Sequence, residues 1–461
     1  MRRRRGSWSV RWFRGTTSPR RRRPLAAERL EERRVLSAAP IVVDPAAYDR
    51  VAPAWFSSAG AGPAVSGGSE WIVRLSKEAT SGMRSVADAA AFLGSAGTAI
   101  ETVRGLGLPG QVLVRAPAGT DVPAILSGLP GVSSVGSNAT ITVQATPNDP
   151  SYSKLYGLNN TGQTGGTADA DIDAPEAWDV SVGSTSTVVG VVDTGIDWTH
   201  PDLAANVWTN PGEVPGNGID DDGNGFVDDV HGYDFVNNDG DPMDDHSHGT
   251  HVAGTIGASG NNGTGVTGVN WSVSLMGLKF LSANGSGTDA DAVRAVNYAT
   301  MMRSMYGINV RVLNASWGAG DFDQGLLDAI NASGAAGILF AAAAGNSAGN
   351  DDLVPFYPAS YDAPSVVAVA ATDSKDFLAS FSCYGVRTVD LAAPGVGILS
   401  TVPGGGYAQY SGTSMATPHV AGAAALLASV NPALSPLDVK SILLGNVDTL
   451  PGLTGKVVSG G

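Results

Sequence analysis

Three separate segments of the 461-residue chain carry side chains that could perform nucleophilic catalysis. Asp193 ends an apolar run, His248 lies in His-Gly-Thr-His, and Ser414 lies in Gly-Thr-Ser-Met-Ala. A serine hydroxyl is a weak nucleophile until an imidazole takes its proton, and the imidazole needs a carboxylate that holds its tautomer and stabilises its charge. The three residue types therefore predict acyl transfer by Ser414, with His248 as the base and Asp193 as its partner.

Asp193 alone permits a different chemistry. Asp193-Thr-Gly resembles half of an aspartic-protease site, and that mechanism needs two carboxylates that share a proton. The sequence has no second Asp-Thr-Gly or Asp-Ser-Gly, so only a homodimer could supply the partner. The segments around His248 and Ser414 favour the serine mechanism.

The histidines near His248 offer an alternative of their own. His246, His248 and His251 have the spacing His-x-His-x-x-His, which could hold zinc across a loop and a helix. No motif with a glutamate base accompanies them. Zinc is therefore the weaker interpretation of this segment.

The segment around Ser414 predicts a buried helix that begins close to this residue. Gly412 permits a tight turn, Pro418 is tolerated only in a first helical turn, and alanines follow. A serine at a helix start most often serves as an N-cap. A cap does not explain why an Asp, a His and a Ser occur together in motifs of this length, so we favour the catalytic role.

Regular elements must position these side chains. Apolar runs at residues 188–192 and 337–343, separated by helix-like segments, are typical of parallel strands covered on both faces. We expect an α/β fold with a mostly parallel sheet sandwiched by helices. Active sites in such folds lie beyond the carboxyl ends of the strands, and the first run stops at Asp193.

A small α+β domain is expected ahead of this fold, over residues 69–145. Strands are predicted at residues 71–75, 111–115 and 139–143, and helices at residues 85–93 and 122–129. Residues 38–68, rich in Ala, Pro, Gly and Ser, are predicted to be a linker.

Charge is distributed unevenly along the chain. The first 34 residues hold 13 of the 28 basic residues, which leaves 15 basic and 40 acidic residues and a net charge of −25 in the remainder. Such a body disfavours nucleic acid as a partner and favours cations. A single cysteine excludes a disulfide framework, so bound calcium is the expected substitute. No apolar run is long enough to span a membrane.

Residues 1–37 form an arginine-rich tail without the apolar core of a signal peptide. One interpretation is a disordered basic tail. The other is a sorting segment, because residues 24–37 resemble an arginine-rich N-terminal tag of bacterial secreted and surface proteins. On the second interpretation the protein is secreted or associated with the cell envelope.

Together, Asp193-Thr-Gly, His248-Gly-Thr-His251 and Gly412-Thr-Ser-Met-Ala416 resemble the signature motifs of the subtilisin-like serine proteases. The likeness runs from about residue 149 to the end. It implies a monomeric endopeptidase acting on proteins or peptides, with Asp193, His248 and Ser414 as the catalytic triad. It also implies that Asn346 and the Ser414 backbone N–H stabilise the oxyanion.

The resemblance assigns substrate-binding segments as well. Residues 314–318 resemble the segment that pairs with the substrate backbone and lines the pocket for the residue before the cut, and residues 285–287 resemble the opposing strand. The residues implied are Gly285, Ser286, Gly287, Ser316, Trp317 and Gly318. Trp317 and the lack of acidic residues in both segments favour large apolar side chains before the cut.

Two calcium sites are expected. The match to the family's tight site gives Asp149, Asp202 and Asn262, with carbonyl groups of Gly260, Thr264 and Val266, although the loop before Asn261 is one residue longer. An insertion at residues 217–229 has the spacing of an EF-hand loop, which gives Asp220, Asp222, Asn224 and Asp228. There His231 replaces the usual glutamate, and a merely solvated acidic loop is the alternative.

The resemblance also gives the small domain a role. Residues 69–145 are expected to be a propeptide that acts in cis, residues 146–461 the peptidase domain, and the chain a self-processed zymogen. The family pattern extends a little further, so the chain is expected to be truncated at its C-terminus. The rival hypothesis is a catalytically idle, calcium-stabilised surface or binding module.

Some further residues receive expectations without a catalytic role. Tyr357-Pro358 matches a family turn and is predicted to be a cis peptide. Cys383 is predicted to be a small packed thiol. The histidines expected to be structural are His200, His231, His246, His251 and His419.

Overall fold

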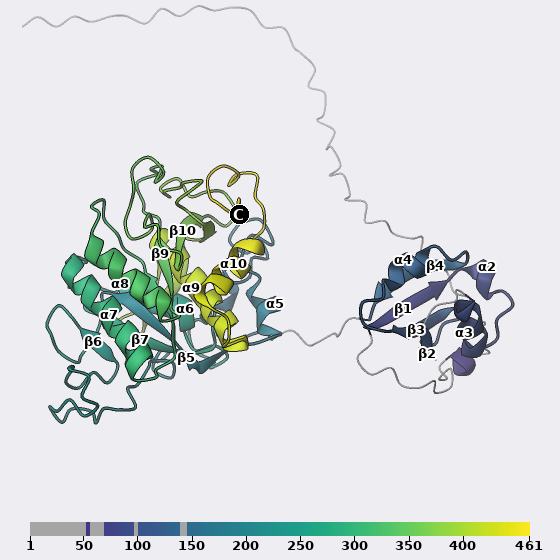
Figure 1. The fold of residues 1–461 in the computed structure, drawn as a ribbon, viewed down its shortest axis with the longest axis horizontal. Helices are drawn as coiled ribbons and strands as arrows, with labels where there is room; N and C mark the ends of the chain where they lie inside the picture. The colour runs from purple at the N-terminus through teal and green to yellow at the C-terminus, as the bar shows by residue number, and fades with distance from the viewer. Residues whose placement is uncertain (1–51, 56–68, 96–99, 139–144) are drawn as a thin grey trace, which may run out of the picture. The chain divides into compact units, whose positions relative to one another are not determined.

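The computed structural model of the protein describes residues 52–55, 69–95, 100–138 and 145–461. The chain divides into two compact units, residues 1–141 and residues 142–461 (Figure 1). The expected strand at residues 139–143 lies outside the described residues.

The smaller unit contains a four-stranded antiparallel sheet in the order β2-β3-β1-β4. Val73, Val112 and Val114 of the sheet share a core with Leu93 and Leu126. Strands β2 and β4 were not predicted, because their sequences carry little apolar pattern and gain their conformation by pairing with β3 and β1. The elements are η1 (Ala52–Trp55), β1 (Ser69–Leu75), α2 (Lys77–Thr80), α3 (Val86–Gly94), β2 (Glu101–Gly105), β3 (Gln111–Ala116), α4 (Val122–Ser127) and β4 (Val132–Ser137).

The larger unit is built on a seven-stranded sheet in the order β11-β10-β9-β8-β5-β7-β6, in which every pair is parallel. This confirms the expected α/β fold. The strands are β5 (Gly183–Asp193), β6 (Gly232–Asp234), β7 (Ser272–Lys279), β8 (Val310–Ala315), β9 (Leu339–Ala343), β10 (Val366–Thr372) and β11 (Leu391–Pro394), and β12 (Ile398–Val402) and β13 (Gly406–Tyr410) form a separate hairpin.

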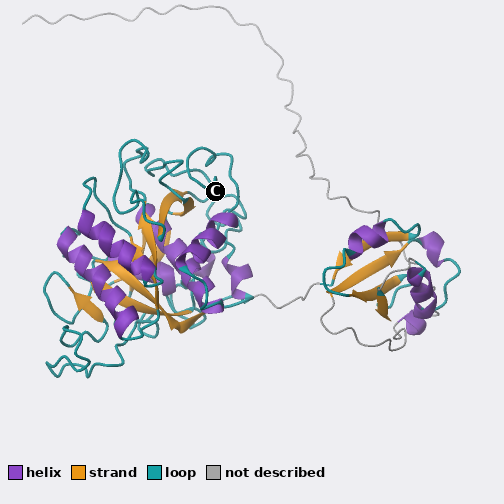
Figure 2. Ribbon diagram, in the orientation of Figure 1, coloured by secondary structure: helices purple, strands orange, loops and turns teal. Residues whose placement is uncertain are grey.

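Helices cover both faces of the large sheet (Figure 2). They are α6 (His248–Gly257), α7 (Asp289–Met305), α8 (Gln324–Ala335), α9 (Thr413–Val430) and α10 (Pro436–Gly445), preceded by the short η2 (Tyr152–Lys154) and α5 (Ala174–Trp178). Along β5, Val189 and Val191 pack with residues of α6 and α9, whereas Val188 and Val192 pack with residues of α7 and α8. Successive side chains of a strand point to opposite faces, so a continuous apolar run is what a sheet between two helical layers requires.

The carboxyl ends of three neighbouring strands bring together residues from distant parts of the sequence. Asp193 ends β5, Ser316 follows β8, and Asn346 lies shortly after β9. Parallel strands end at the same edge of a sheet, and this is the edge at which α6 and α9 begin with His248 and Thr413.

Candidate active site

Asp193 and His248 form a buried hydrogen-bonded pair. His248 Nδ1 lies 2.8 Å from Asp193 Oδ1 and 3.0 Å from Oδ2, and the carboxylate is fully buried. Burial by itself lowers the pKa of His248, but the charge and hydrogen bond of Asp193, together with the charge of Asp244, hold that pKa above its ordinary value of 6.5. In the part of the chain that the structure describes, no hydrogen bond is given to the second ring nitrogen, Nε2, which the contact places on the side of the ring away from the carboxylate.

The start of α6 is held against the end of β5 by a polar network. Asp244 accepts hydrogen bonds from Thr194 Oγ1 at 2.9 Å and from Thr250 Oγ1 at 2.6 Å. The Gly249 N–H in turn donates to Thr194 Oγ1 at 2.9 Å. A Cβ at Gly249 would lie 2.1 Å from the Gly195 carbonyl oxygen, so only glycine allows this approach. Neither Thr194 nor Asp244 was singled out from the sequence.

Ser414 lies in the first turn of α9 and is tied to Ser316. Ser414 Oγ donates to the Ser316 carbonyl at 2.9 Å, and Ser316 Oγ donates to the Ser414 carbonyl at 2.8 Å. Among the described residues, the structure gives no hydrogen bond between Ser414 Oγ and His248. Both side chains nevertheless line one cleft of about 390 Å³.

The expectation that Pro418 belongs to a first helical turn is wrong. It lies inside α9, which begins at Thr413. Proline has no N–H and cannot donate to the carbonyl of the residue four positions earlier, which here is Ser414. That carbonyl instead accepts from Ser316 Oγ, so a side chain in the loop after β8 replaces the missing helical hydrogen bond.

Asn346 lines the same cleft with its amide oriented by Thr413. Asn346 Oδ1 accepts from the Thr413 N–H at 2.8 Å and from Thr413 Oγ1 at 3.1 Å. The oxygen is therefore engaged on the protein side, and the Nδ2 donor remains available to the cleft. Tyr357-Pro358, in the loop after Asn346, is a cis peptide, which confirms the prediction.

The segments expected to bind substrate line the cleft and its neighbourhood. Gly285, Ser316, Trp317 and Gly318 line the cleft together with the catalytic candidates, and Ser286 and Gly287 line an adjoining pocket. Residues 285–287, expected to be the opposing strand, form a bend at Gly285 followed by two residues without regular secondary structure. A Cβ at Gly318 would lie 2.4 Å from the Phe356 ring, so glycine keeps the pocket beside Phe356 open.

The three histidines of the zinc interpretation do not converge. His251 is buried, stacks on Tyr410, and its Nε2 faces the carbonyls of Ile398 and Ala408. Burial lowers the pKa of His251 to about 4. His246 lines the cleft beside His248. Within the described ranges, the one group of three His, Cys, Asp or Glu side chains close enough to share a metal is Glu213, Asp220 and Asp222.

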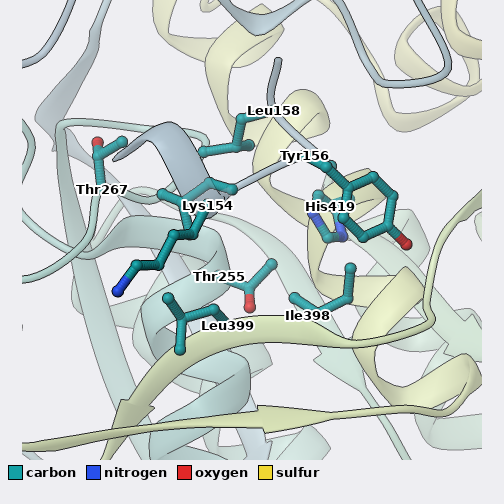
Figure 3. A pocket seen from close by; sticks show the side chains of 10 residues that line it. Lys154, Tyr156, Leu158, Thr255, Thr267, Ile398, Leu399 and His419 are labelled. Carbon is teal, nitrogen blue, oxygen red and sulfur yellow. The ribbon is translucent and has the colours of Figure 1, made fainter. Parts of the chain in front are cut away.

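The remaining histidines and the cysteine lie outside the active-site cleft and contact other parts of the fold. His200 Nε2 faces the Gly406 carbonyl and His231 Nδ1 the Trp208 carbonyl. Cys383 is buried, as predicted. His419 lines a cavity of about 20 Å³ beside Tyr156 (Figure 3). A space of that size holds a water molecule at most, so it is no substrate site.

The first expected calcium site gathers two buried carboxylates around one loop. Asp149 Oδ2 accepts from the Asn261 N–H at 2.7 Å, and Asp202 Oδ1 accepts from Asn262 Nδ2 at 2.9 Å. Asp202 Oδ2 accepts from the Val266 N–H at 2.8 Å. Burial raises the pKa of Asp149, and the charge of Asp202 raises it further. Two carboxylates buried together are a donor set that suits a hard cation. The structure also places Thr264 in this loop, where its N–H donates to Asn262 Oδ1, and Gly260 beside the Trp271 ring.

The insertion at residues 217–229 folds around a different set from the expected one. Glu213, which precedes the insertion, joins Asp220 and Asp222 in the acidic group. Asn224 donates to Asp222 and to the buried Asp229, whereas Asp228 accepts from the backbone of residues 217 and 218. Glu213 was missed because the EF-hand spacing directs attention only to residues within the loop.

The carboxyl edge of this parallel sheet carries a buried Asp-His pair and a serine at a helix start. This arrangement is compatible with the class of serine hydrolases. Residues 184–459 match the model of the subtilase family, so the chain belongs to this family of serine proteases.

The chain is also similar to individual proteins. The chain is 42% identical over 285 residues to the thermophilic serine proteinase of Bacillus sp. strain AK1, which covers 62% of this chain and 60% of that protein. It is 38% identical over 308 residues to thermitase of Thermoactinomyces vulgaris, covering 67% of this chain and 93% of thermitase. A crystal structure of a cold-adapted subtilisin-like serine proteinase is 34% identical with a TM-score of 0.45, covering 60% of this chain and 89% of that one.

Proposed function

We propose that the chain is a serine endopeptidase that hydrolyses peptide bonds of proteins through Asp193, His248 and Ser414. The observation that carries this proposal is the hydrogen bond from buried Asp193 to His248, which lines one cleft together with Ser414 and Asn346. Attack requires Ser414 Oγ to turn from the Ser316 carbonyl toward His248, which is a rotation about one side-chain bond. His248 Nε2 then takes the proton, and Asp193 stabilises the imidazolium.

Asn346 and the Ser414 backbone N–H supply the oxyanion donors in this proposal. Thr413 fixes the Asn346 amide through its oxygen, so Nδ2 is oriented before substrate arrives. Donors fixed in advance stabilise the developing charge without reorganisation during the reaction. His248 returns its proton to the leaving amine, and the same groups promote hydrolysis of the acyl-enzyme.

Residues 69–145 are proposed to act as a propeptide in cis, released by the enzyme itself, and residues 146–461 as a monomeric peptidase domain. The support is the division of the chain into two units with separate cores. We further propose a secreted or envelope-associated protein. None of the helices within the described ranges combines the length and apolar character needed to cross a bilayer.

Calcium is the proposed structural ion. Asp149, Asp202 and Asn262 with the loop carbonyls would hold one ion, and Asp220, Asp222 and Glu213 a second. A bound ion would neutralise carboxylates that otherwise repel one another in an acidic domain. It has no part in the chemical steps.

Labelling with a serine-reactive fluorophosphonate tests the function directly. The purified protein should be labelled at Ser414, and Ser414→Ala should lose labelling, peptide hydrolysis and release of residues 69–145. Folded protein that takes up no label would favour the idle binding module.

A further inference from the structure

A second pocket, of about 250 Å³, adjoins the active-site cleft. Trp317 and Gly318 line both spaces. In the proposed function, the segment from Ser316 to Gly318 pairs with the part of the substrate before the cut. A substrate side chain from this part is therefore within reach of the second pocket.

The apolar surface of this pocket is built from aromatic rings held in place. Phe280 and Trp317 have ring centroids 4.6 Å apart, and Tyr357 and Tyr361 have centroids 4.7 Å apart. Trp317 Nε1 donates to the Val192 carbonyl at 2.8 Å. Ala319 and Tyr357 exchange two backbone hydrogen bonds of 2.7 Å. The pocket is thus formed before any ligand binds, which lowers the entropic cost of binding.

Two exposed aspartates also line the pocket, and one of them, Asp289, lies in the first turn of α7. In the interactions that the structure gives for the described residues, Asp289 and Asp321 accept no side-chain or backbone hydrogen bond and form no ion pair. No Lys or Arg is among the lining residues. The neighbouring carboxylates are engaged, because Asp291 pairs with Arg294 and Asp323 caps α8. The pocket therefore offers aromatic faces together with two free negative charges.

We propose that this pocket selects a Lys or Arg side chain of the substrate at a position away from the scissile bond, with Asp289 and Asp321 as specificity-determining residues. The inference rests on the proposed peptidase function. A long cationic side chain lays its methylene stem on apolar surface and keeps its charged end near water and counter-charges. Aromatic faces attract the same cations. The pocket for the residue immediately before the cut, beside Phe356, keeps its apolar preference.

The test is a peptide series in which each position before the cut in turn carries Lys, Arg, norleucine or Glu. At one position away from the cut, kcat/KM for Lys or Arg should exceed that for norleucine by about five-fold, the size expected for exposed charge pairs with some cation–π contact. Glu should be the poorest. Asp289→Asn and Asp321→Asn should each lower kcat/KM for the Lys and Arg peptides, and the double variant should bring these values close to that for norleucine.

Two controls make the test specific. Asp328→Asn removes one charge from the exposed surface of α8 without touching the pocket, and it should leave the preference intact. In the wild type, the preference should shrink as salt rises from about 0.01 to 1 M, where the Debye length falls from about 30 to about 3 Å. Equilibrium binding of the same peptides to Ser414→Ala should follow the same order without turnover.

The inference is overturned if no position shows the preference, or if the double Asn variant or high salt leaves it unchanged. Cleavage of the peptides without any preference for a basic residue would contradict this inference and leave the proposed function intact. Failure of fluorophosphonate labelling and of all peptide cleavage contradicts the proposed function as well.

Discussion

Ser316→Ala should destabilise the larger unit because it removes the donor that replaces the helical bond lost at Pro418. Ser316 is 3% exposed, and its Oγ donates to the Ser414 carbonyl at 2.8 Å while it accepts from Asn314 Nδ2 at 2.9 Å. The substitution leaves a partly buried acceptor, the Ser414 carbonyl, and a buried donor, Asn314 Nδ2, without this partner. A group of this kind costs about 1–3 kcal/mol, so we expect the free energy of unfolding to fall by roughly 2–4 kcal/mol.

The assay is urea unfolding in the Ser414→Ala background, which keeps the carbonyl of residue 414 but prevents self-digestion. Pro418→Ala supplies the missing backbone N–H and should rescue part of the loss caused by Ser316→Ala. A double-mutant cycle should therefore give a coupling energy of about 1 kcal/mol or more between the two positions. Strict additivity of the two substitutions would refute the idea that Ser316 compensates for Pro418.

Three further outcomes follow from the same structure. Neutral His248 is the base and its pKa is raised, so the acid limb of the kcat/KM profile should lie above pH 6.5. Activity should be lost as the pH falls through the pKa of His248. A limb well below pH 6.5 in a peptide assay would contradict this. A chelator should lower the melting temperature and a reductant should not. Asp202→Ala and Asp222→Ala should each reduce the amount of calcium bound per chain. An unchanged melting temperature in metal-free protein would contradict both calcium sites. Lys440→Met should lower the free energy of unfolding by about 2–3 kcal/mol, because it removes the ion-pair partner of the partly buried Asp390. Adding Asp390→Asn should recover most of that loss in urea unfolding. A loss that the second substitution leaves unchanged would indicate that Lys440 acts through packing alone.

Local sequence was enough to predict the elements with strong patterns. The apolar run ending at Asp193 predicted a strand buried on both faces, and the small residues after His248 indicated a helix packed closely on its neighbours. Both features depend on the periodicity of apolar side chains and on the size of glycine, which are properties of short segments. By contrast, β2 and β4 depend on partners in the sheet, and their own residues carry too little pattern to reveal them.

The sequence by itself determined the α/β fold and the subtilase family, because motifs several residues long each carry their chemistry in fixed local spacing. The tertiary structure alone decided which groups support those motifs. Thr194 and Asp244 hold the start of α6, Ser316 serves the helix that Pro418 interrupts, and Glu213 joins an acidic loop that follows it in the chain. The Glu213 group forms within one loop region, outside the spacing of an EF-hand. The hydrogen bonds of Thr194, Asp244 and Ser316 join residues that are distant in sequence, and they exist only when the sheet has brought its strand ends to one edge. No local sequence pattern predicts which strand ends come together, so these contacts can be identified only in the folded chain.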